Sequence, residues 1–548
     1  MVQTKKIMLF FLVSLVLRAD ESLEKLAPLL DDISGEFIQN HTEVLGSDFM
    51  EGRATGSRGE RLAADYIRSK LKEYNVEPAV GRRSYFQNIP LHGSTPLSSS
   101  RFTLHCQGKT VNFELAKDYV LYNTGAQTFL PKPLPLVFVG HGIVAPEFDY
   151  NDYQNVDVTD KIVVYLSGEP VSDDPAYFDG PHPTIYSYAE SKERLAISRG
   201  ARGCLLIPHP DEMLTSWDEV RREFLFEDVR LAYSVTDIFS AMINPDTAAL
   251  LFDGAEHSLE SVFQWRREHI MLSFELPIRI SFRGQFEERD FFSRNILAEV
   301  RGTDSSLRDS YLILSAHYDH LGIGAPVCND SIYNGVVDNA IGTAALLEIA
   351  RALQKSPPKR SVLFMFLTGE EKGLLGSTYY IDNPVIPHFK TIANINIDGL
   401  AIFDTFRDII GFGTDMSTLG DVLHSTATLF GVSLSRLPRD FSRTESFARS
   451  DQIVFAKAGI PAALVMEGVL FDHLSASEGI QKHIKWMQNI YHSPFDDLTQ
   501  PIHWSAAEQH CQLLLAFAWK LANAATAPTW LPGTPYVTTR LQSIAEKK

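Results

Sequence analysis

The chain has 548 residues, of which 45% are hydrophobic and 22% charged, and its formal net charge is −18 at pH 7. This composition is that of a globular protein long enough for two or three domains and a large buried core. The negative charge argues against nucleic acid as a partner, because phosphate binding needs clustered Lys and Arg. Four scattered cysteines exclude a disulfide framework and a cysteine zinc site, but not a single disulfide.

The N-terminus has the pattern of a secretory signal. Lys5 and Lys6 precede an apolar run over residues 7–17, which is too short for an ordinary membrane span. We therefore expect residues 1–20 to be a signal peptide, a secreted or periplasmic location, and no stable membrane association beyond this segment. An uncleaved anchor is the alternative, because the residues around Ala19 match a cleavage site poorly.

The first segment after the signal is helical in pattern. Residues 22–78 favour helix, most clearly over 60–71, where apolar residues recur on one face. Ahead of that helix, residues 51–57 (EGRATGS) form a glycine-rich loop. We interpret this loop as a turn, because it does not have the context of a phosphate-binding motif.

A region with a different sequence pattern begins near Pro135 and ends near Pro277. Short strand patterns at 136–143, 161–170 and 203–210 are separated by Pro and Gly, with a helical pattern at 191–201. This predicts a smaller β-rich domain inserted into a larger one. The expected division is 1–20 signal, 21–134 first catalytic segment, 135–277 inserted domain, 278–528 catalytic domain with the metal site, and 529–548 an irregular tail.

From Asn295 onward strand and helix patterns alternate. Apolar strands are predicted at 295–300, 311–317, 361–369, 391–398 and 460–467, and a helix follows Asp338 over 339–353. Continuous apolar strands are typical of a sheet covered on both faces. The pattern therefore predicts an α/β three-layer sandwich with a mostly parallel central sheet.

Metal-type residues lie at the ends of these segments: His317, Asp338, Glu371, Asp398 and His492. Two histidines and three carboxylates suit a pair of divalent metals that share one carboxylate, and imidazole with carboxylate suits zinc. Glu370 is a spare carboxylate beside one of them, an arrangement for hydrolysis. Each residue alone has a simpler explanation, such as a helix N-cap for Asp338.

The ordered set resembles a known family. The motifs are His317-Tyr318-Asp319, Asp338-Asn339-Ala340, Glu370-Glu371, Asp398 and Tyr491-His492. Together they resemble the co-catalytic zinc aminopeptidases, relatives of glutamate carboxypeptidase and the transferrin receptor, over roughly residues 45–525. Within the predicted insertion, residues 140–153 and 199–207 resemble the protease-associated domain found in several members.

The resemblance implies two zinc ions per chain and a role for each motif residue. One zinc is held by His317 and Asp398 and the other by Glu371 and His492, with Asp338 bridging them. Glu370 is implied as the general base for a metal-bridging hydroxide, Asp319 as the carboxylate that orients the His317 ring, and Tyr491 as a stabiliser of the oxyanion. His320 departs from the Ser of the simplest members, and a long connection before Tyr491 is expected to form a rim with His473 and His483 as candidate substrate contacts.

The expected activity is that of a zinc-dependent exopeptidase, an aminopeptidase acting on peptide or aminoacyl substrates. One alternative is a carboxypeptidase of the glutamate carboxypeptidase type, which would need an arginine pocket, for example from Arg436, Arg439, Arg443 and Arg449. Two further hypotheses share the fold: a one-zinc glutaminyl cyclase and a non-catalytic, receptor-like protein. The sequence determines neither the side-chain preference nor the oligomeric state.

Overall fold

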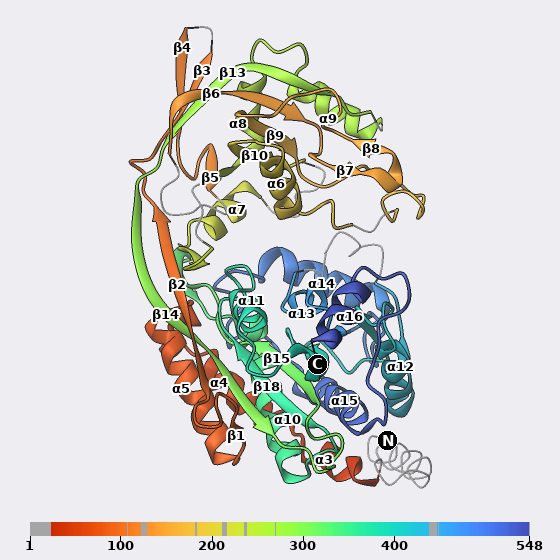
Figure 1. The fold of residues 1–548 in the computed structure, drawn as a ribbon. Helices are drawn as coiled ribbons and strands as arrows, with labels where there is room; N and C mark the ends of the chain where they lie inside the picture. The colour runs from red at the N-terminus through yellow and green to blue at the C-terminus, as the bar shows by residue number, and fades with distance from the viewer. Residues whose placement is uncertain are drawn as a thin grey trace. The chain divides into compact units, whose positions relative to one another are not determined.

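The computed structural model forms two compact units (Figure 1). It describes residues 24–106, 108–121, 129–180, 184–210, 216–234, 238–268, 270–437, 447 and 449–546, so the predicted signal segment lies outside the described residues. Among the described residues, the larger unit comprises those up to 89, 292–437 and those from 447 onward, and the smaller unit comprises those between 90 and 291. The chain leaves the larger unit along β2 (Phe86–Pro96) and returns along β14 (Phe286–Val300).

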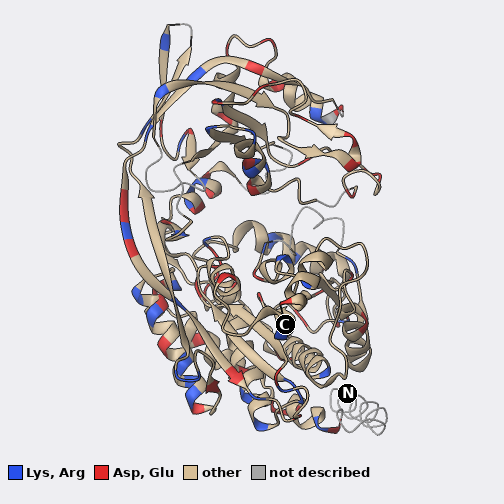
Figure 2. Cartoon of the chain, in the orientation of Figure 1, with Lys and Arg blue, Asp and Glu red and all other residues tan. Residues whose placement is uncertain are grey.

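The larger unit begins with the predicted helical segment: α3 (Leu26–Asp32), α4 (Gly35–Leu45), the short helix η2 (Asp48–Arg53) and α5 (Arg58–Glu73). Helix α5 starts where the Ser57 side chain accepts the backbone N–H of Glu60, a typical N-cap. Its buried face includes Ala63, Ile67 and Leu71, and acidic and basic residues follow one another on its outer side (Figure 2). The helix predicted over 60–71 is therefore confirmed.

The central sheet of the larger unit has the strand order β14-β18-β15-β19-β22-β20-β21, with β1 (Glu77–Pro78) beside β14. The remaining bounds are β15 (Tyr311–His317), β18 (Ser361–Leu367), β19 (Thr391–Asn396), β20 (Asp408–Phe412), β21 (Ser433–Leu434) and β22 (Ala462–Glu467). Strands β18, β15, β19 and β22 are parallel to one another, whereas β14 and β20 pair antiparallel with their neighbours. The α/β fold with a parallel centre to its sheet is confirmed, but the whole sheet, which continues from β14 through β2 to β11 (Asp228–Leu231), is mixed because antiparallel strands lie on both sides of that centre.

Both faces of this sheet are buried. Alternate residues of β15 enter two different cores: Leu312 and Leu314 pack with the helices of one side, and Ile313 packs on the other. The first side is covered by α4, α5, α10 (Ile341–Lys355) and α15 (Trp504–Asn523), and the second by α11 (Leu375–Asp382) and α13 (Gln452–Lys457). This is the three-layer α/β sandwich that the apolar strands predict.

The C-terminal tail differs from its prediction. The Pro and Thr content of residues 529–548 predicts an irregular segment, but α16 (Val537–Ala545) is a helix. Trp530 is buried in the core beside α13, and its indole N–H donates to the carbonyl of Gly459 (2.8 Å). This anchor holds the tail against the larger unit, which local composition does not reveal.

The remaining elements of the larger unit are the hairpin β16 (Gly322–Val327) and β17 (Asp330–Tyr333), the turn η5 (Val336–Ala340), the short helix η6 (His388–Lys390), α12 (Leu419–Phe430) and α14 (Ala476–Asn489). Helix α14 occupies the long connection expected before Tyr491. It begins with a capping box in which Ser475 and Glu478 satisfy each other's backbone N–H groups.

The smaller unit contains a sheet with the order β4-β3-β13-β6-β9-β10-β12-β5. The helices and strands of the whole smaller unit are β3 (Arg101–Cys106), β4 (Lys109–Phe113), β5 (Tyr119–Leu121), β6 (Phe129–Val139), β7 (Val144–Ala145), η3 (Pro146–Phe148), β8 (Tyr150–Asn151), β9 (Ile162–Leu166), α6 (Ala189–Ser198), β10 (Gly203–Ile207), α7 (Trp217–Phe224), β11 (Asp228–Leu231), β12 (Phe239–Ile243), α8 (Pro245–Ala248), η4 (Ala249–Phe252), α9 (Leu259–Arg267) and β13 (Ser273–Arg283). Strands β6, β9, β10 and β12 are parallel.

The extent of the smaller unit differs from the sequence-based boundaries. Both predicted boundaries, 135 and 277, lie inside the unit, which runs from Pro90 to Phe291. The reason is pairing: β13 hydrogen-bonds to β3 and to β6, so the strands before residue 135 belong to the same sheet. Such long-range pairing is not visible in local composition.

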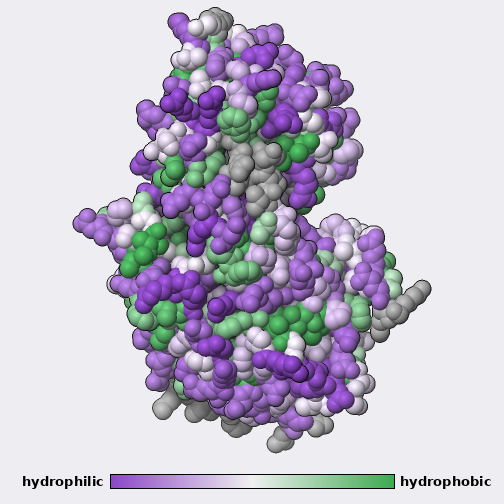
Figure 3. All heavy atoms as spheres, turned by 60° about the vertical axis from the view of Figure 1, so that its left-hand side comes forward, coloured by the Kyte–Doolittle hydropathy of each residue, from purple (hydrophilic) through white to green (hydrophobic). Residues whose placement is uncertain are grey.

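All four cysteines are free, so the single disulfide that the sequence left open does not form. Within the described residues no helix has the length and hydrophobicity needed to span a membrane. The surface view is mainly hydrophilic, and its apolar patches are interrupted by polar residues (Figure 3).

Candidate metal centre

Three neighbouring parallel strands deliver ligand-type side chains to one edge of the central sheet. His317 is the last residue of β15, Glu370 and Glu371 follow β18, and Asp398 follows β19. The order β18-β15-β19 brings these strand ends together. A site beyond the carboxyl ends of the strands is where ligands bind in open α/β sheets.

The first group of donors surrounds His317. Its Nε2 lies 3.1 Å from Asp398 Oδ1 and 3.2 Å from Asp338 Oδ1. His317 is fully buried, and Asp398 is the most exposed of the three, with 22% of its side chain accessible. One ligand atom from each residue lies within 4.8 Å of the others, so this group could hold a metal ion.

The second group surrounds His492, which follows α14. Its Nε2 lies 3.1 Å from Glu371 Oε2 and 3.4 Å from Asp338 Oδ2. The backbone of His492 has φ 52°, a left-handed conformation that is uncommon outside glycine. All five predicted metal residues are therefore brought together, although they span 176 positions of sequence from 317 to 492.

Asp338 connects the two groups. Its Oδ1 faces His317 and its Oδ2 faces His492, so each oxygen is directed at a different donor group. Two ligands about 2.1 Å from a tetrahedral zinc are separated by about 3.4 Å. The separations of 3.1–3.4 Å between these donors agree with that value, so the residues fit two zinc ions that share one carboxylate.

The loop that carries Asp338 is held by side chains of its neighbours. The Asp496 carboxylate accepts the backbone N–H groups of Val337 (2.9 Å) and Asp338 (3.0 Å). The side chain of Asn339 donates to the carbonyl of Ile397 (2.8 Å) and accepts the N–H of Gly399 (2.9 Å), which ties the loop to the segment of Asp398. Asp338 makes no side-chain cap for α10, so the N-cap explanation does not apply.

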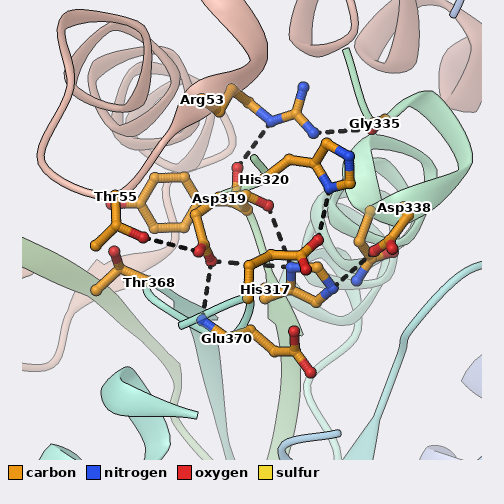
Figure 4. A network of polar contacts seen from close by, with 12 residues as sticks. Arg53, Thr55, His317, Asp319, His320, Gly335, Asp338, Thr368 and Glu370 are labelled. Atoms are coloured by element: carbon orange, nitrogen blue, oxygen red, sulfur yellow. Dashed lines mark hydrogen bonds and ion pairs between the residues drawn. The ribbon is translucent and has the colours of Figure 1, made fainter. Parts of the chain in front are cut away.

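Glu370 lies beside the donors without being needed in either group. With His317 and Glu371 it forms a third group whose ligand atoms lie close enough together to hold a metal ion. Burial raises the pKa of Glu370 well above its usual range; the charge of His317 opposes this, and those of Asp398 and Glu371 reinforce it. Its backbone N–H donates to Asp319 Oδ1 (3.2 Å), as Figure 4 shows.

Asp319 contacts the His317 ring through a different atom from the one expected. The ring Nδ1 is 3.2 Å from the backbone carbonyl oxygen of Asp319 and 3.8 Å from its carboxylate. The main-chain carbonyl of Asp319, and not its carboxylate, is therefore the acceptor for the His317 ring. The carboxylate instead accepts from Thr55 Oγ1 (3.0 Å) and from the backbone of Glu370 (Figure 4).

Two further predicted residues lie near the second group. The Tyr491 ring stacks on His492 with centroids 3.8 Å apart, and burial raises the pKa of Tyr491 well above its usual range. His320 Nδ1 is 2.6 Å from Glu371 Oε1, which is a hydrogen-bond separation and too short for two ligands of one zinc. His320 thus holds the oxygen of Glu371 that does not face His492.

The candidate substrate contacts His473 and His483 face carboxylates. His473 Nδ1 is 3.0 Å from Asp404 Oδ1, and His483 Nε2 is 3.4 Å from Glu467 Oε1 at the end of β22. Burial opposes protonation of His483, but Glu467 outweighs it and raises the pKa. These contacts suit a structural role for both histidines.

Sequence reasoning assigns no role to Arg53, Thr55, His320 or Asp496, all of which contact the site. In the sequence, His320 stands out only as a departure from the simplest members of the family. Asp496 carries one signal, since it follows His492 by four residues in a turn with two successive acids. Arg53 and Thr55 carry almost none, because they lie more than 250 residues before the ligands.

The fold and the site define an α/β sandwich protein whose histidine and carboxylate side chains are grouped where they could hold metal ions. Residues 295–518, which include all five donors, match the model of peptidase family M28. The fold agrees: the aminopeptidase from Aneurinibacillus sp. strain AM-1 superposes with a TM-score of 0.55 at 18% identity, covering 92% of this chain and 98% of that one.

Two curated relatives show how far the similarity extends. Leupeptin-inactivating enzyme 1 of Streptomyces exfoliatus is 27% identical over 262 residues, which are 45% of this chain and 51% of that protein. Probable glutamate carboxypeptidase VP8 of Zea mays is 31% identical over 216 residues, which are 36% of this chain and 27% of that protein. The chain thus spans about half the length, or less, of the curated relatives it matches.

Proposed function

We propose that this protein is a zinc-dependent aminopeptidase that removes N-terminal residues from peptides. The observation that carries the proposal is the placement of Asp338, whose two oxygens face two separate histidine-carboxylate groups. His317, Asp398 and Asp338 would hold one zinc, and His492, Glu371 and Asp338 the other. When bound, the pair of ions would polarise the scissile carbonyl and lower the pKa of the attacking water.

The chain supplies the proton transfers. Glu370 stands beside the donors and forms with His317 and Glu371 a further group that could itself hold a metal ion. Because each proposed zinc already has three donors without it, we assign the Glu370 carboxylate to take a proton from water and give it to the leaving amine. Burial raises the pKa of Glu370, and a carboxylate with a raised pKa accepts a proton more readily than an ordinary one. Tyr491, stacked on His492, would stabilise the negative charge that develops on the carbonyl oxygen.

The charge of the site favours a substrate with a free amine. Asp451 is a buried carboxyl outside the proposed ligand set, and it interacts electrostatically with Glu370 and Asp398. A carboxyl group that is not bound to zinc attracts a protonated N-terminus and repels a C-terminal carboxylate. The similarity in fold to an aminopeptidase also supports the proposal of a substrate with a free amine.

A pair of substrates tests this proposal. We expect the full chain with zinc to hydrolyse an aminoacyl arylamide, to leave an N-acylated dipeptide intact, and to lose activity with a chelator. Cleavage of the N-acylated dipeptide alone would exclude the aminopeptidase. A folded, zinc-loaded protein that cleaves neither substrate would favour the non-catalytic, receptor-like alternative.

Carboxypeptidase activity is the second candidate. It is supported by the similarity to the Zea mays protein named as a probable glutamate carboxypeptidase. Arg449 is exposed and interacts electrostatically with Tyr491, so one cation lies near the site. Of the remaining arginines that could form a carboxylate pocket, Arg436 is exposed, and Arg439 and Arg443 lie outside the described residues.

A further inference from the structure

Arg53, in the glycine-rich loop near the N-terminus, is a buried cation next to the candidate metal centre. Only 1% of the residue is exposed. Its guanidinium donates to four backbone carbonyls: Leu45 (2.7 Å), Tyr318 (2.8 Å), Asn334 (2.6 Å) and Gly335 (2.8 Å). A guanidinium has five N–H groups in a rigid plane, so it fixes the relative positions of the carbonyls it binds.

These carbonyls belong to the two segments that carry the donors of the metal centre. Tyr318 lies directly after His317, and Asn334 and Gly335 shortly precede Asp338. Figure 4 shows the Arg53 guanidinium reaching the main chain at both places. Arg53 therefore joins the His317 segment to the Asp338 segment through one side chain.

The rest of the loop makes direct contacts with the same residues. Thr55 donates its hydroxyl to Asp319 Oδ2 (3.0 Å), and the backbone N–H of His320 donates to the carbonyl of Arg53 (3.2 Å). Gly52 permits this close approach: a Cβ there would lie 2.3 Å from the carbonyl oxygen of Tyr333, and its φ is +63°. The loop is thus packed directly against the hairpin that leads to Asp338.

The charge of Arg53 suits its surroundings. Burial lowers the pKa of Arg53 to about 10, while Asp496, Asp319, Asp338 and Glu371 act in the opposite direction. The side chain therefore remains cationic at neutral pH. A fixed positive charge inside the fold reduces the mutual repulsion of the carboxylates before metal ions bind.

We propose that Arg53 and Thr55 are positioning residues of the metal centre, which extends the site beyond the matched segment 295–518. Arg53 fixes the distance between the His317 and Asp338 segments. Thr55 fixes Asp319, whose carbonyl meets the His317 ring and whose carboxylate holds the backbone of Glu370. This inference rests on the proposed zinc-dependent function.

Zinc affinity of the full-length protein, measured by competition with a chromophoric chelator, tests the proposal. We expect Thr55→Val, which removes the hydroxyl and keeps the volume, to weaken at least one of the two zinc-binding steps by about 10–100-fold. Thr55→Ser keeps the hydroxyl and should restore binding, a rescue that a packing role would not produce. Thr414→Val is the matched control, because Thr414 is also buried and donates its hydroxyl to the carbonyl of Gly411.

Arg53→Lys tests the part of the proposal that concerns Arg53. Lysine keeps the charge but cannot span the four carbonyls, so we expect both zinc steps to weaken. Arg58→Met is the control, since Arg58 belongs to the same region but is largely exposed and pairs with Glu51. Wild-type zinc affinity in both Thr55→Val and Arg53→Lys would overturn the proposal. Wild-type protein that binds two zinc ions but cleaves no peptide would instead contradict the proposed function.

Discussion

Both units place histidines at or just beyond the ends of parallel strands, yet among the described residues only the larger unit surrounds such a histidine with donors that could hold a metal ion. In the larger unit, His317 ends β15 among carboxylates. In the smaller unit, His141 follows β6 and His209 follows β10, and both are buried. Among the described residues, every group able to hold a metal belongs to the larger unit.

The neighbours of each histidine account for the difference. Burial lowers the pKa of His317, but Asp398 and Glu370 outweigh it and hold that pKa well above its usual range. Burial lowers the pKa of His141 well below its usual range, and the charges of Lys192 and Arg266 lower it further. A strand-end histidine therefore indicates a ligand only when acids from other segments converge on it.

The largest expected effect is the loss of the general base. Glu370→Gln should reduce kcat by about 10²–10⁴-fold while both zinc ions remain bound, because Glu370 transfers protons and is not required as a ligand. Arylamide hydrolysis and zinc content measure the two properties. Glu193→Gln, which changes a buried carboxylate of the smaller unit that accepts a hydrogen bond from Ser240, should leave both unchanged. Wild-type kcat in the Glu370→Gln variant would show that Glu370 is not the general base.

The next largest effect is expected from replacing His492, compared with replacing His209 of the smaller unit. His492→Ala should lower the zinc content from two towards one ion per chain and reduce kcat by about 10²–10³-fold, because one metal loses a ligand. His209→Ala, the matched change in the smaller unit, should alter neither quantity. Equal zinc loss in the two variants, by elemental analysis after dialysis, would mean that the site is not confined to the larger unit.

A smaller effect is expected at Tyr491. Tyr491→Phe removes only the hydroxyl and preserves the ring that stacks on His492. We expect kcat to fall by about 10²-fold with little change in KM or zinc content, since an oxyanion donor acts in the transition state. A rise in KM at unchanged kcat would assign the hydroxyl to substrate binding instead.

The smallest effect concerns the stability of the smaller unit. Burial raises the pKa of Asp152 to about 7, whereas its unfolded value is about 3.9. The protonated form is thus favoured in the folded state, so its contribution to stability is complete below about pH 4 and is lost as pH rises through 7. In the Asp152→Asn variant, the change in Tm between about pH 4 and pH 7 should be smaller than in the wild type by a few degrees. An unchanged slope would exclude Asp152 as the titrating group.

Much of the fold and of the donor set could be predicted from sequence because the signals are local. Residues 311–317 form β15 as expected, and the runs at 361–369 and 391–398 contain β18 and β19. Polar residues at the ends of such strands must meet at one sheet edge. His317, Glu371 and Asp398 are therefore recognisable from their strands, whereas Asp338 and His492 are recognisable only through the family motifs in which they stand.

What could not be predicted depends on contacts between distant segments. Pairing of β13 with β3 sets the limits of the smaller unit, and Trp530 anchors the C-terminal tail. Arg53 reaches the carbonyl of Gly335 across 282 positions of sequence. Backbone carbonyls exist at every residue, so an acceptor of this kind leaves no trace in the amino-acid pattern.

The most direct test of the two-metal centre is a crystal structure of the zinc-loaded protein with anomalous data collected at the zinc edge. We predict two anomalous peaks, one beside His317 and Asp398 and one beside His492 and Glu371, with one oxygen of Asp338 directed at each. A single peak, or two peaks that do not share Asp338, would contradict the account.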